Sequence, residues 1–349
     1  MTGSMNESTI IKAAVQFGKG IPTLELLGSG LIHRTYKVNF TEHASIVLQC
    51  INQATFSQPE NIINNYRLVY DYLEKQSLGI RVPALLTTNN KKYFWIDGDN
   101  NFWRATEFIE GSYTPPIPEN SQQVFSGAKC FAALTGSLKG LDTETFDIII
   151  RNFHDLGFRY QQFEDAIRAA PMMRLLKATH VISELRDRHS LVDFYKELSA
   201  DEINYPTRIM HHDCKVSNIL FNKATSQVIC PVDLDTLMPG KYFSDIGDMI
   251  RTMACTVDEN STAWEQINVN KEYYDAIVSG YMEGMENILT EKEKQNIHQS
   301  GLILAYMQSL RFVTDFLNND IYYKTSYPEQ NLNRALNQLL LLERLETLI

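Results

Sequence analysis

The stretch that decides the fold runs from His212 to Asn218, His-Asp-Cys-Lys-Val-Ser-Asn, and is followed by Val232-Asp233-Leu234-Asp235. It places an acid five residues before an amide, and a second acid at the end of the apolar run 228–232. Phosphoryl transfer needs such a set, because its catalysis consists mainly of positioning and charge neutralisation. Each of these residues alone is an ordinary turn residue. Their combination, with a short hairpin between loop and apolar strand, predicts a catalytic loop.

The spacing assigns a role to each polar side chain of this stretch. We expect Asp213 to be the catalytic base that takes the proton of an acceptor hydroxyl. Asn218 and Asp233 are expected to hold Mg²⁺ against the β- and γ-phosphates of ATP, since hard cations prefer oxygen ligands. His212 and Asp235 are expected to support the site, and for Asp235 either a position behind the metal or one facing the acceptor is possible.

Two further acids follow closely in Ser244-Asp245-Ile246-Gly247-Asp248. An Asp at the start of a helix is most simply an N-terminal cap, and we expect this of Asp245. Asp248 is expected to orient the catalytic loop through hydrogen bonds to its backbone.

Composition limits the classes of protein to consider. A chain of 349 residues suits two lobes better than one core. The net charge of −10 argues against a nucleic-acid partner. No apolar run reaches the roughly 20 residues that span a bilayer, and no signal peptide is evident. The five cysteines are widely spread without metal-ligand spacing, which favours reduced thiols in the cytoplasm. The oligomeric state stays open.

Hydrophobic periodicity divides the chain at residue 110. Residues 1–110 are expected to form a small antiparallel α+β lobe that carries the nucleotide, with helices over 7–18 and 61–76 and strands within 24–39, 45–50 and 91–109. The turn residues 97–100 predict a hairpin within the last of these stretches. Three prolines in residues 115–118 predict an extended connection. Residues 111–349 predict a larger, mainly helical lobe for catalysis and acceptor binding, including helices over 271–285, 291–318 and 330–347. The fold class is therefore α+β and bilobal.

Two stretches of the smaller lobe are candidates for nucleotide binding. Gly28 and Gly30 lie between the first two predicted strands, where glycines let backbone N–H groups approach phosphates closely. At the end of the last strand, the carbonyl of Glu107 and the N–H of Ile109 could bind the adenine edge. A plain hairpin turn and a plain strand end are the alternatives.

The set Asp213, Asn218 and Asp233 resembles the aminoglycoside phosphotransferase and choline kinase superfamily, which has a bilobal, protein-kinase-like fold. Several blocks are more narrowly similar to bacterial N-acetylhexosamine 1-kinases, among them Asp-Leu-Asp-Thr-x-Met-Pro-Gly at 233–240 and Tyr-Pro-Glu-x-Asn-Leu at 327–332. The resemblance extends from about residue 24 to residue 340. It implies a kinase that uses ATP and Mg²⁺ to phosphorylate the anomeric hydroxyl of N-acetylglucosamine or N-acetylgalactosamine.

The resemblance also implies that Arg311 and Tyr322, together with Asp213, contact the sugar. An Arg offers hydrogen bonds of fixed geometry, and a Tyr offers a hydroxyl on an apolar platform. The alternative is that Arg311 forms an i, i+4 ion pair with Asp315 while Tyr322 packs in the core.

One departure from the usual kinase pattern concerns the third strand. Kinase-like folds normally carry a Lys there, paired with a Glu of the next helix, to bind the α- and β-phosphates. Here the position is Gln49, which we assign to nucleotide binding, and the predicted helix has no Glu before Glu74. This leaves two alternatives open: a kinase for another small alcohol, such as an amino alcohol, homoserine or an aminoglycoside, and a pseudokinase that only binds nucleotide.

Overall fold

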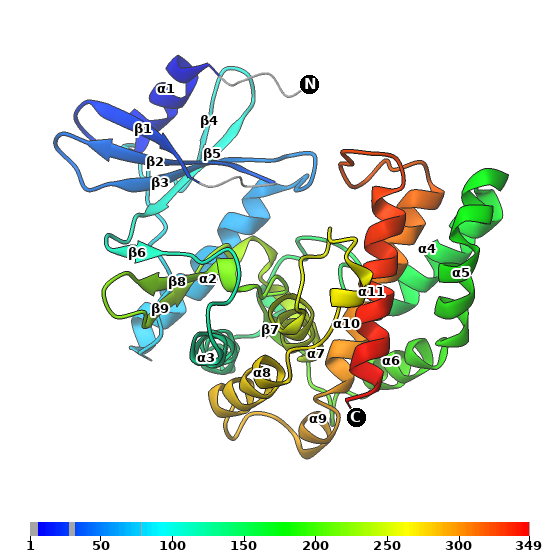
Figure 1. The fold of residues 1–349 in the computed structure, drawn as a ribbon. Coiled ribbons are helices and arrows are strands. Elements are labelled where there is room, and N and C mark those ends of the chain that lie inside the picture. The colour runs from blue at the N-terminus through cyan, green and yellow to red at the C-terminus, as the bar shows by residue number, and fades with distance from the viewer. Residues whose placement is uncertain (1–5, 28–31, 78, 349) are drawn as a thin grey trace.

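The smaller lobe is built on a five-stranded antiparallel sheet. The computed structural model describes residues 6–27, 32–77 and 79–348 (Figure 1), so Gly28 and Gly30, predicted to bind the nucleotide, lie outside the described residues. The strand order is β1-β2-β3-β5-β4. The strands span β1 Pro22–Leu26, β2 Arg34–Phe40, β3 Ile46–Ile51, β4 Trp95–Ile96 and β5 Phe102–Glu107. The predicted hairpin around residues 97–100 is the connection between β4 and β5.

Side chains on the two faces of this sheet pack against two different helices. Helix α1 (Glu7–Phe17) packs against one face, where Leu48 and Trp103 are fully buried. Helix α2 (Pro59–Gln76) packs with Ile51 and Phe102, which point to the other face. Side chains alternate along a strand, so Gln49 and Arg104 also project to the α2 side.

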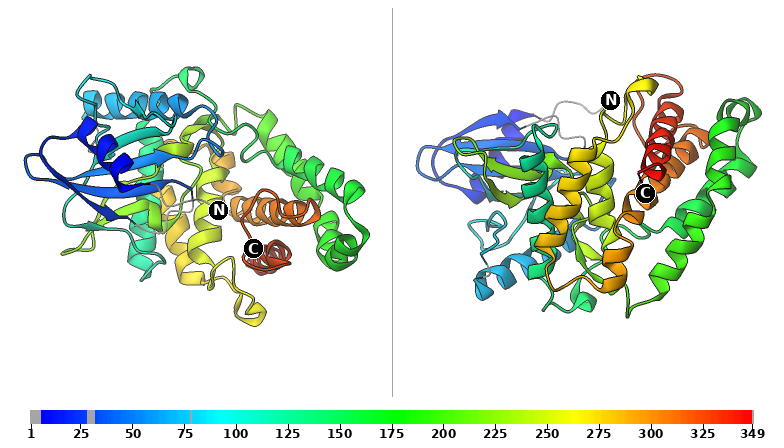
Figure 2. Two further views of the ribbon diagram at one scale, coloured as in Figure 1. Left: turned by 90° about the horizontal axis from the view of Figure 1, so that it is seen from above. Right: turned by 60° about the horizontal axis from the view of Figure 1, so that its bottom comes forward.

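The larger lobe is mainly helical (Figures 1 and 2). Its helices are α3 Ser121–Ser137, α4 Leu156–Ala169, α5 Met172–Asp187, α6 Ser190–Ala200, α7 Phe243–Met249, α8 Lys271–Gly284, α9 Glu291–Gln295, α10 Gln299–Leu317 and α11 Gln330–Glu346. Helices α3 and α8 can approach closely because α8 carries glycines where they meet. A Cβ on Gly280 or Gly284 would lie 2.3 Å or 2.6 Å from a backbone carbonyl of α3. Helices α10 and α11 lie side by side, and α4 packs against α10.

Two small sheets position the catalytic loop. One has the order β6-β8-β9, with β6 Ser112–Tyr113, β8 Ile219–Asn222 and β9 Val228–Pro231. The other pairs β7 (Arg208–Met210) with β10 (Met238–Gly240). The predicted α+β arrangement is confirmed. The division between residues 110 and 111 remains our proposal, and β5 and β6 on either side of it belong to different sheets.

The prediction of one helix over 291–318 was wrong, because residues 296–298 interrupt it. Glu293 is fully buried in an ion pair with Arg208, and it forms a capping box with Thr290 that starts the short helix α9. The carbonyl of Asn296 accepts the backbone N–H of Gln299 (3.0 Å), an i, i+3 bond of a turn, and also the hydroxyl of Tyr242 (3.1 Å). Contacts made far along the chain therefore end α9.

No helix among the described residues combines the length and apolar character needed to cross a membrane. All five cysteines are free, and four of them are buried.

Candidate active site

The catalytic loop follows β7 and is fixed through its backbone by one buried acid. The N–H groups of His211 and His212 donate to the two carboxylate oxygens of Asp245, at 3.0 Å and 2.7 Å. Asp245 belongs to α7 and is fully buried. This overturns the expected division of labour: Asp245 orients the loop, whereas Asp248 forms an ion pair with Arg251 at 2.8 Å. The two acids are three residues apart on a helix, so spacing alone could not decide which one faces the loop.

The ring of His212 contacts two segments outside the catalytic loop. Its Nδ1 lies 2.6 Å from the hydroxyl of Ser244, and its Nε2 lies 3.2 Å from the carbonyl of Met238. His212 has a left-handed backbone conformation (φ 67°). A Cβ on Gly240 would lie 2.4 Å from its ring, so only glycine fits there without displacing His212. The ring therefore fixes the turn that immediately precedes Asp213.

Asp213 lies among hydrogen-bond donors from its own loop. Asn218 Nδ2 donates to its carboxylate (2.8 Å) and to its carbonyl (2.9 Å), and Lys215 Nζ lies 2.9 Å from the same carboxylate. Burial alone would raise the pKa of Asp213, but Lys215, His211 and Asn218 together lower it below its ordinary value. Asp213 is therefore a carboxylate at neutral pH, as a proton acceptor must be.

Lys215 is a site residue that our reading of the sequence missed. Burial would lower its pKa, but the carboxylates of Asp213 and Asp233 raise it. The ammonium group is therefore charged and lies between the two acids of the proposed site. Its position two residues after the predicted base was the signal that could have revealed it.

Asp233 follows β9 in a left-handed conformation (φ 60°), at the start of the turn 234–236. Burial, and then the carboxylates of Asp235 and Asp213, raise its pKa. A buried carboxylate with two acidic neighbours is one that a divalent cation would stabilise. The described residues contain no cluster of three or more acidic, His or Cys side chains arranged to hold a metal. Mg²⁺ normally takes one or two protein ligands, with water and phosphate oxygens completing its shell, and Asp233 with Asn218 fits this pattern.

Asp235 neither joins these two residues nor faces the acceptor side. It is 2% exposed, and its carboxylate contacts His33 Nε2 (2.7 Å) and Arg104 (2.5 Å), which both come from the smaller lobe. Burial would raise the pKa of Asp235, but Arg104 and His33 hold it well below its ordinary value. Asp235 therefore connects the turn that carries Asp233 to the sheet of the smaller lobe.

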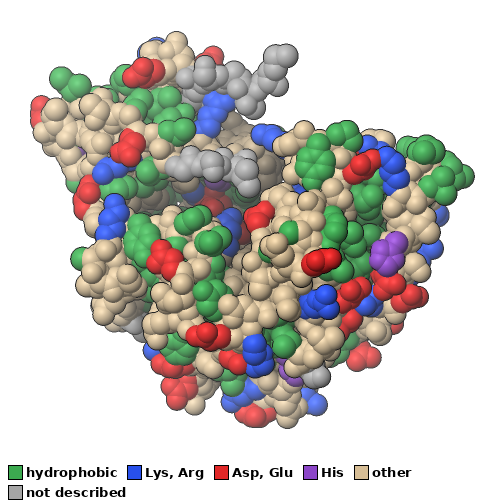
Figure 3. All heavy atoms as spheres, in the orientation of Figure 1, with side chains coloured by type: hydrophobic (Ala, Val, Ile, Leu, Met, Phe, Trp, Pro, Cys, Tyr) green, Lys and Arg blue, Asp and Glu red, His purple; other side chains and the backbone are tan. Residues whose placement is uncertain are grey.

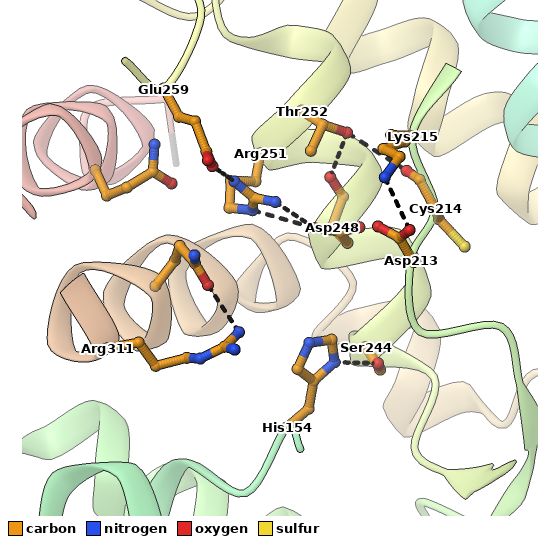
Figure 4. Close-up of polar contacts among 12 residues, drawn as sticks. His154, Asp213, Cys214, Lys215, Ser244, Asp248, Arg251, Thr252, Glu259 and Arg311 are labelled. Atoms are coloured by element: carbon orange, nitrogen blue, oxygen red, sulfur yellow. Dashed lines mark hydrogen bonds and ion pairs between the residues drawn. The ribbon is translucent and has the colours of Figure 1, made fainter. Parts of the chain in front are cut away.

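The residues predicted to bind the acceptor lie between α4 and α10. A cavity of about 200 Å³ is lined by Arg159, Gln162, Arg311, Thr314, Asp315, Asn318, Ile321, Tyr322 and Tyr323. Arg311 donates to Gln308 and lies over the ring of Phe153, 5.4 Å from its centre. Figure 4 shows its guanidinium extending from α10 toward His154.

The alternative ion pair between Arg311 and Asp315 does not form. Asp315 instead accepts the backbone N–H groups of Tyr322 (2.8 Å) and Tyr323 (2.9 Å), and the side chain of Asn331. Tyr322 is 64% exposed, so it does not pack in the core either. Arg311 and Tyr322 therefore line the same cavity, with Asp315 fixing the turn that carries the tyrosine.

Two acids on the catalytic-loop side of Arg311, Asp248 and Glu259, are paired with arginines. Arg251 bridges Asp248 and Glu259 (Figure 4), and Glu259 also contacts Arg334. Cys214, next to the proposed base, is fully buried, and burial followed by Asp245 and Asp248 raises its pKa well above the ordinary value. Its thiol is therefore protonated and packed, and not a nucleophile.

The backbone proposed for adenine binding directly follows β5. Glu107 is the last residue of this strand, and its side chain is held by Arg81 and by the N–H of Ala84. The carbonyl of Ile109 accepts the hydroxyl of Ser112 (2.6 Å). The assignment of Glu107 and Ile109 to adenine stays a prediction. Figure 3 shows that the molecular surface is hollowed between the two lobes, with acidic and basic side chains around the recess.

Comparison with known proteins decides the family. The model of the phosphotransferase enzyme family matches residues 23–281, which span most of the smaller lobe, the catalytic loop and the larger lobe as far as α8. The chain belongs to this family. It is therefore a phosphotransferase, and the predicted kinase-like fold is confirmed.

Solved structures of similar fold cover nearly the whole chain. A microcompartment-associated aminopropanol kinase is 16% identical, with a TM-score of 0.67 and 98% of each chain covered. An aminoglycoside phosphotransferase from Alicyclobacillus acidocaldarius is 13% identical, with a TM-score of 0.65 over 100% of this chain and 97% of that one. An amicoumacin kinase, solved in complex with AMP-PNP, Ca²⁺ and Ami, is 13% identical, with a TM-score of 0.63 over 96% of this chain and 93% of that one. At these identities the likeness establishes the fold.

Proposed function

We propose that this phosphotransferase uses ATP and Mg²⁺ to phosphorylate the anomeric hydroxyl of an N-acetylhexosamine, N-acetylglucosamine or N-acetylgalactosamine. In this reaction the acceptor oxygen bonds to the γ-phosphorus of ATP, the bond from that phosphorus to the ADP oxygen breaks, and the acceptor proton passes to Asp213. Mg²⁺, held by Asn218 and Asp233, would neutralise charge on the phosphates. Lys215 keeps Asp213 ionised and adds a positive charge beside the transferred group.

The observation that carries the proposed acceptor is the charge of the cavity beside α10. Arg311 and Arg159 both line it, and no ion pair involving either is found within the described part of the chain. Arg159 donates to Gln162 and to the carbonyl of Phe153, while burial and the nearby Arg311 lower its pKa to about 10. Two guanidinium groups bonded only to neutral partners favour an acceptor rich in carbonyl and hydroxyl oxygens.

The same charges oppose a cationic acceptor. An amino alcohol or an aminoglycoside needs a free carboxylate to bind its ammonium group. Asp248 and Glu259 are engaged by arginines, and Asp315 by backbone N–H groups and Asn331. An N-acetyl group instead offers a carbonyl oxygen that Arg311 can bind, with the exposed Tyr322 beside the sugar ring.

A panel of acceptors tests this proposal. ADP release would be measured at one concentration of Mg·ATP with N-acetylglucosamine, N-acetylgalactosamine, glucosamine, ethanolamine, homoserine and an aminoglycoside. We expect the two N-acetylhexosamines to be the fastest acceptors, and glucosamine, which replaces the acetamide with an ammonium group, to be slower. Faster turnover of ethanolamine, homoserine or the aminoglycoside would replace the sugar with that acceptor. Binding of Mg·ADP with no turnover of any acceptor would favour a pseudokinase.

A further inference from the structure

A buried cluster occupies the place where kinase-like folds normally bind phosphate with a lysine. Arg104 on β5 is 2% exposed and lies directly opposite Gln49 in the register of β3 and β5. Its Nε and one terminal nitrogen both donate to Gln49 Oε1, at 2.9 Å and 2.8 Å. The same terminal nitrogen contacts Asp235 at 2.5 Å. One guanidinium therefore holds a side chain of the smaller lobe and one of the larger lobe.

The contacts of Arg104 determine which way the amide of Gln49 points. A guanidinium has only donors, so the atom of Gln49 that faces it is the carbonyl oxygen. The amide nitrogen is turned away from Arg104 and donates one hydrogen to Thr35 Oγ1 (3.2 Å) on β2. Its second hydrogen remains available at the lysine position, so Gln49 is a fixed donor there.

Asp235 links the same cluster to the metal site. His33 Nδ1 accepts the backbone N–H of Asn52 (3.0 Å), so the ring hydrogen is on Nε2 and faces Asp235. Arg104 and His33 thus hold Asp235 from the smaller lobe. Because Asp235 lies two residues after Asp233, they also fix the turn that presents the proposed metal ligand.

Helix α2 does not supply the usual acidic partner. Its acids, Glu60, Asp71 and Glu74, are all exposed. The positions of α2 that point inward are occupied by uncharged side chains such as Asn65 and Tyr66. An acid of the metal-binding turn, Asp235, takes this place. The cation of this ion pair is Arg104 on β5, whereas kinase-like folds normally use a lysine on the third strand.

We propose that Arg104 is a positioning residue that replaces the strand lysine and its ion pair. It holds the amide of Gln49 as a hydrogen-bond donor to the phosphates of the nucleotide and, through Asp235, aligns Asp233 with the same phosphates. Arg104 also has a terminal nitrogen that is buried without a hydrogen-bond partner, so the guanidinium is not fully satisfied by the protein. This inference rests on the proposed use of ATP and not on the identity of the acceptor.

The decisive variant is Gln49→Glu, because glutamate still accepts both hydrogen bonds from Arg104 but offers no donor and adds a negative charge. Binding of adenosine, AMP and Mg·ADP would be measured by calorimetry, together with the melting temperature. We expect the affinity for Mg·ADP to fall by about tenfold or more, since hydrogen bonds to charged groups are among the stronger ones. The affinity for adenosine and the melting temperature should change little.

The matched control is Gln53→Glu, which makes the same change of charge at an exposed position of the same lobe. It should bind all three nucleotides like the parent. A second variant, Arg104→Met, frees the amide of Gln49 and should also weaken Mg·ADP more than adenosine. If Gln49→Glu bound Mg·ADP as tightly as the parent, or weakened adenosine equally, the inference would be overturned. A parent chain that bound no Mg·ADP would instead remove the proposed use of ATP.

Discussion

Replacing Asp245 with asparagine tests how the structure holds its catalytic loop. Asp245 is fully buried and accepts the N–H groups of His211 and His212 with its two carboxylate oxygens. An asparagine has only one such oxygen, so its NH₂ group would face one of the two donors. Hydrogen bonds to a charged group contribute about 1.5–3 kcal/mol each, and a buried donor without a partner adds its own cost. We therefore expect Asp245→Asn to destabilise the protein by about 2–4 kcal/mol.

The catalytic consequence should exceed the loss of stability, because the same loop carries Asp213. A displacement of about 1 Å at a reacting group can cost on the order of 100-fold in rate. We expect kcat to fall at least about tenfold at a temperature where the variant is folded, with the KM for ATP nearly unchanged. Steady-state kinetics and thermal melting would measure both effects.

Asp315→Asn is the matched comparison, since Asp315 is also a buried acid that accepts two backbone N–H groups. It fixes the turn of Tyr322 on the acceptor side, so its loss should raise the KM for the acceptor more than it lowers kcat. If Asp245→Asn retained kcat within about twofold of the parent, Asp245 would not be holding the loop for catalysis. It would equally fail if the two variants showed the same kinetic pattern.

Four further outcomes follow from the geometry. Asp213→Asn should lower turnover by about 10²–10⁴-fold while Mg·ADP still binds, and a variant with more than about half the parent turnover would exclude Asp213 as base. Asp233→Ala should be inactive at every Mg²⁺ concentration, whereas excess Mg²⁺ or Mn²⁺ should partly restore Asn218→Ala; equal behaviour of the two would contradict their separate roles. Arg311→Ala should raise the KM for the acceptor at least about tenfold without changing that for ATP, and a lower melting temperature with both KM values unchanged would make Arg311 structural. Gly284→Ala should lower the melting temperature, because its Cβ would lie 2.6 Å from the carbonyl of Lys129. An overpacked core position costs about 1–3 kcal/mol. An unchanged melting temperature would show that α3 and α8 can separate freely.

The parts of the fold that depend on local sequence were predictable. The helices α1 and α2, the hairpin of β4 and β5, and the loop from His212 to Asn218 follow from periodicity, turn residues and motif spacing. All of these signals lie within about 20 residues of chain, where local conformational preferences act.

What escaped prediction depends on contacts between distant segments. The pair of Arg104 with Asp235 joins two lobes, and nothing in either local sequence indicates it. Asp245 and Asp248 lie in one helical segment, so only the placement of α7 against the catalytic loop decides which acid accepts the loop N–H groups. The interruption before α10 likewise depends on Tyr242, more than 50 residues earlier in the chain.

In the proposed reaction, the γ-phosphoryl group of ATP is transferred to the anomeric oxygen of an N-acetylhexosamine. The most direct test compares N-acetylglucosamine with its methyl glycoside, which keeps the acetamide and the other hydroxyls but blocks the anomeric one. Product would be identified by ³¹P NMR after incubation with Mg·ATP. We predict a sugar 1-phosphate from N-acetylglucosamine and no phosphorylated product from the glycoside. Phosphorylation of the methyl glycoside, or of another hydroxyl of the free sugar, would exclude transfer to the anomeric oxygen.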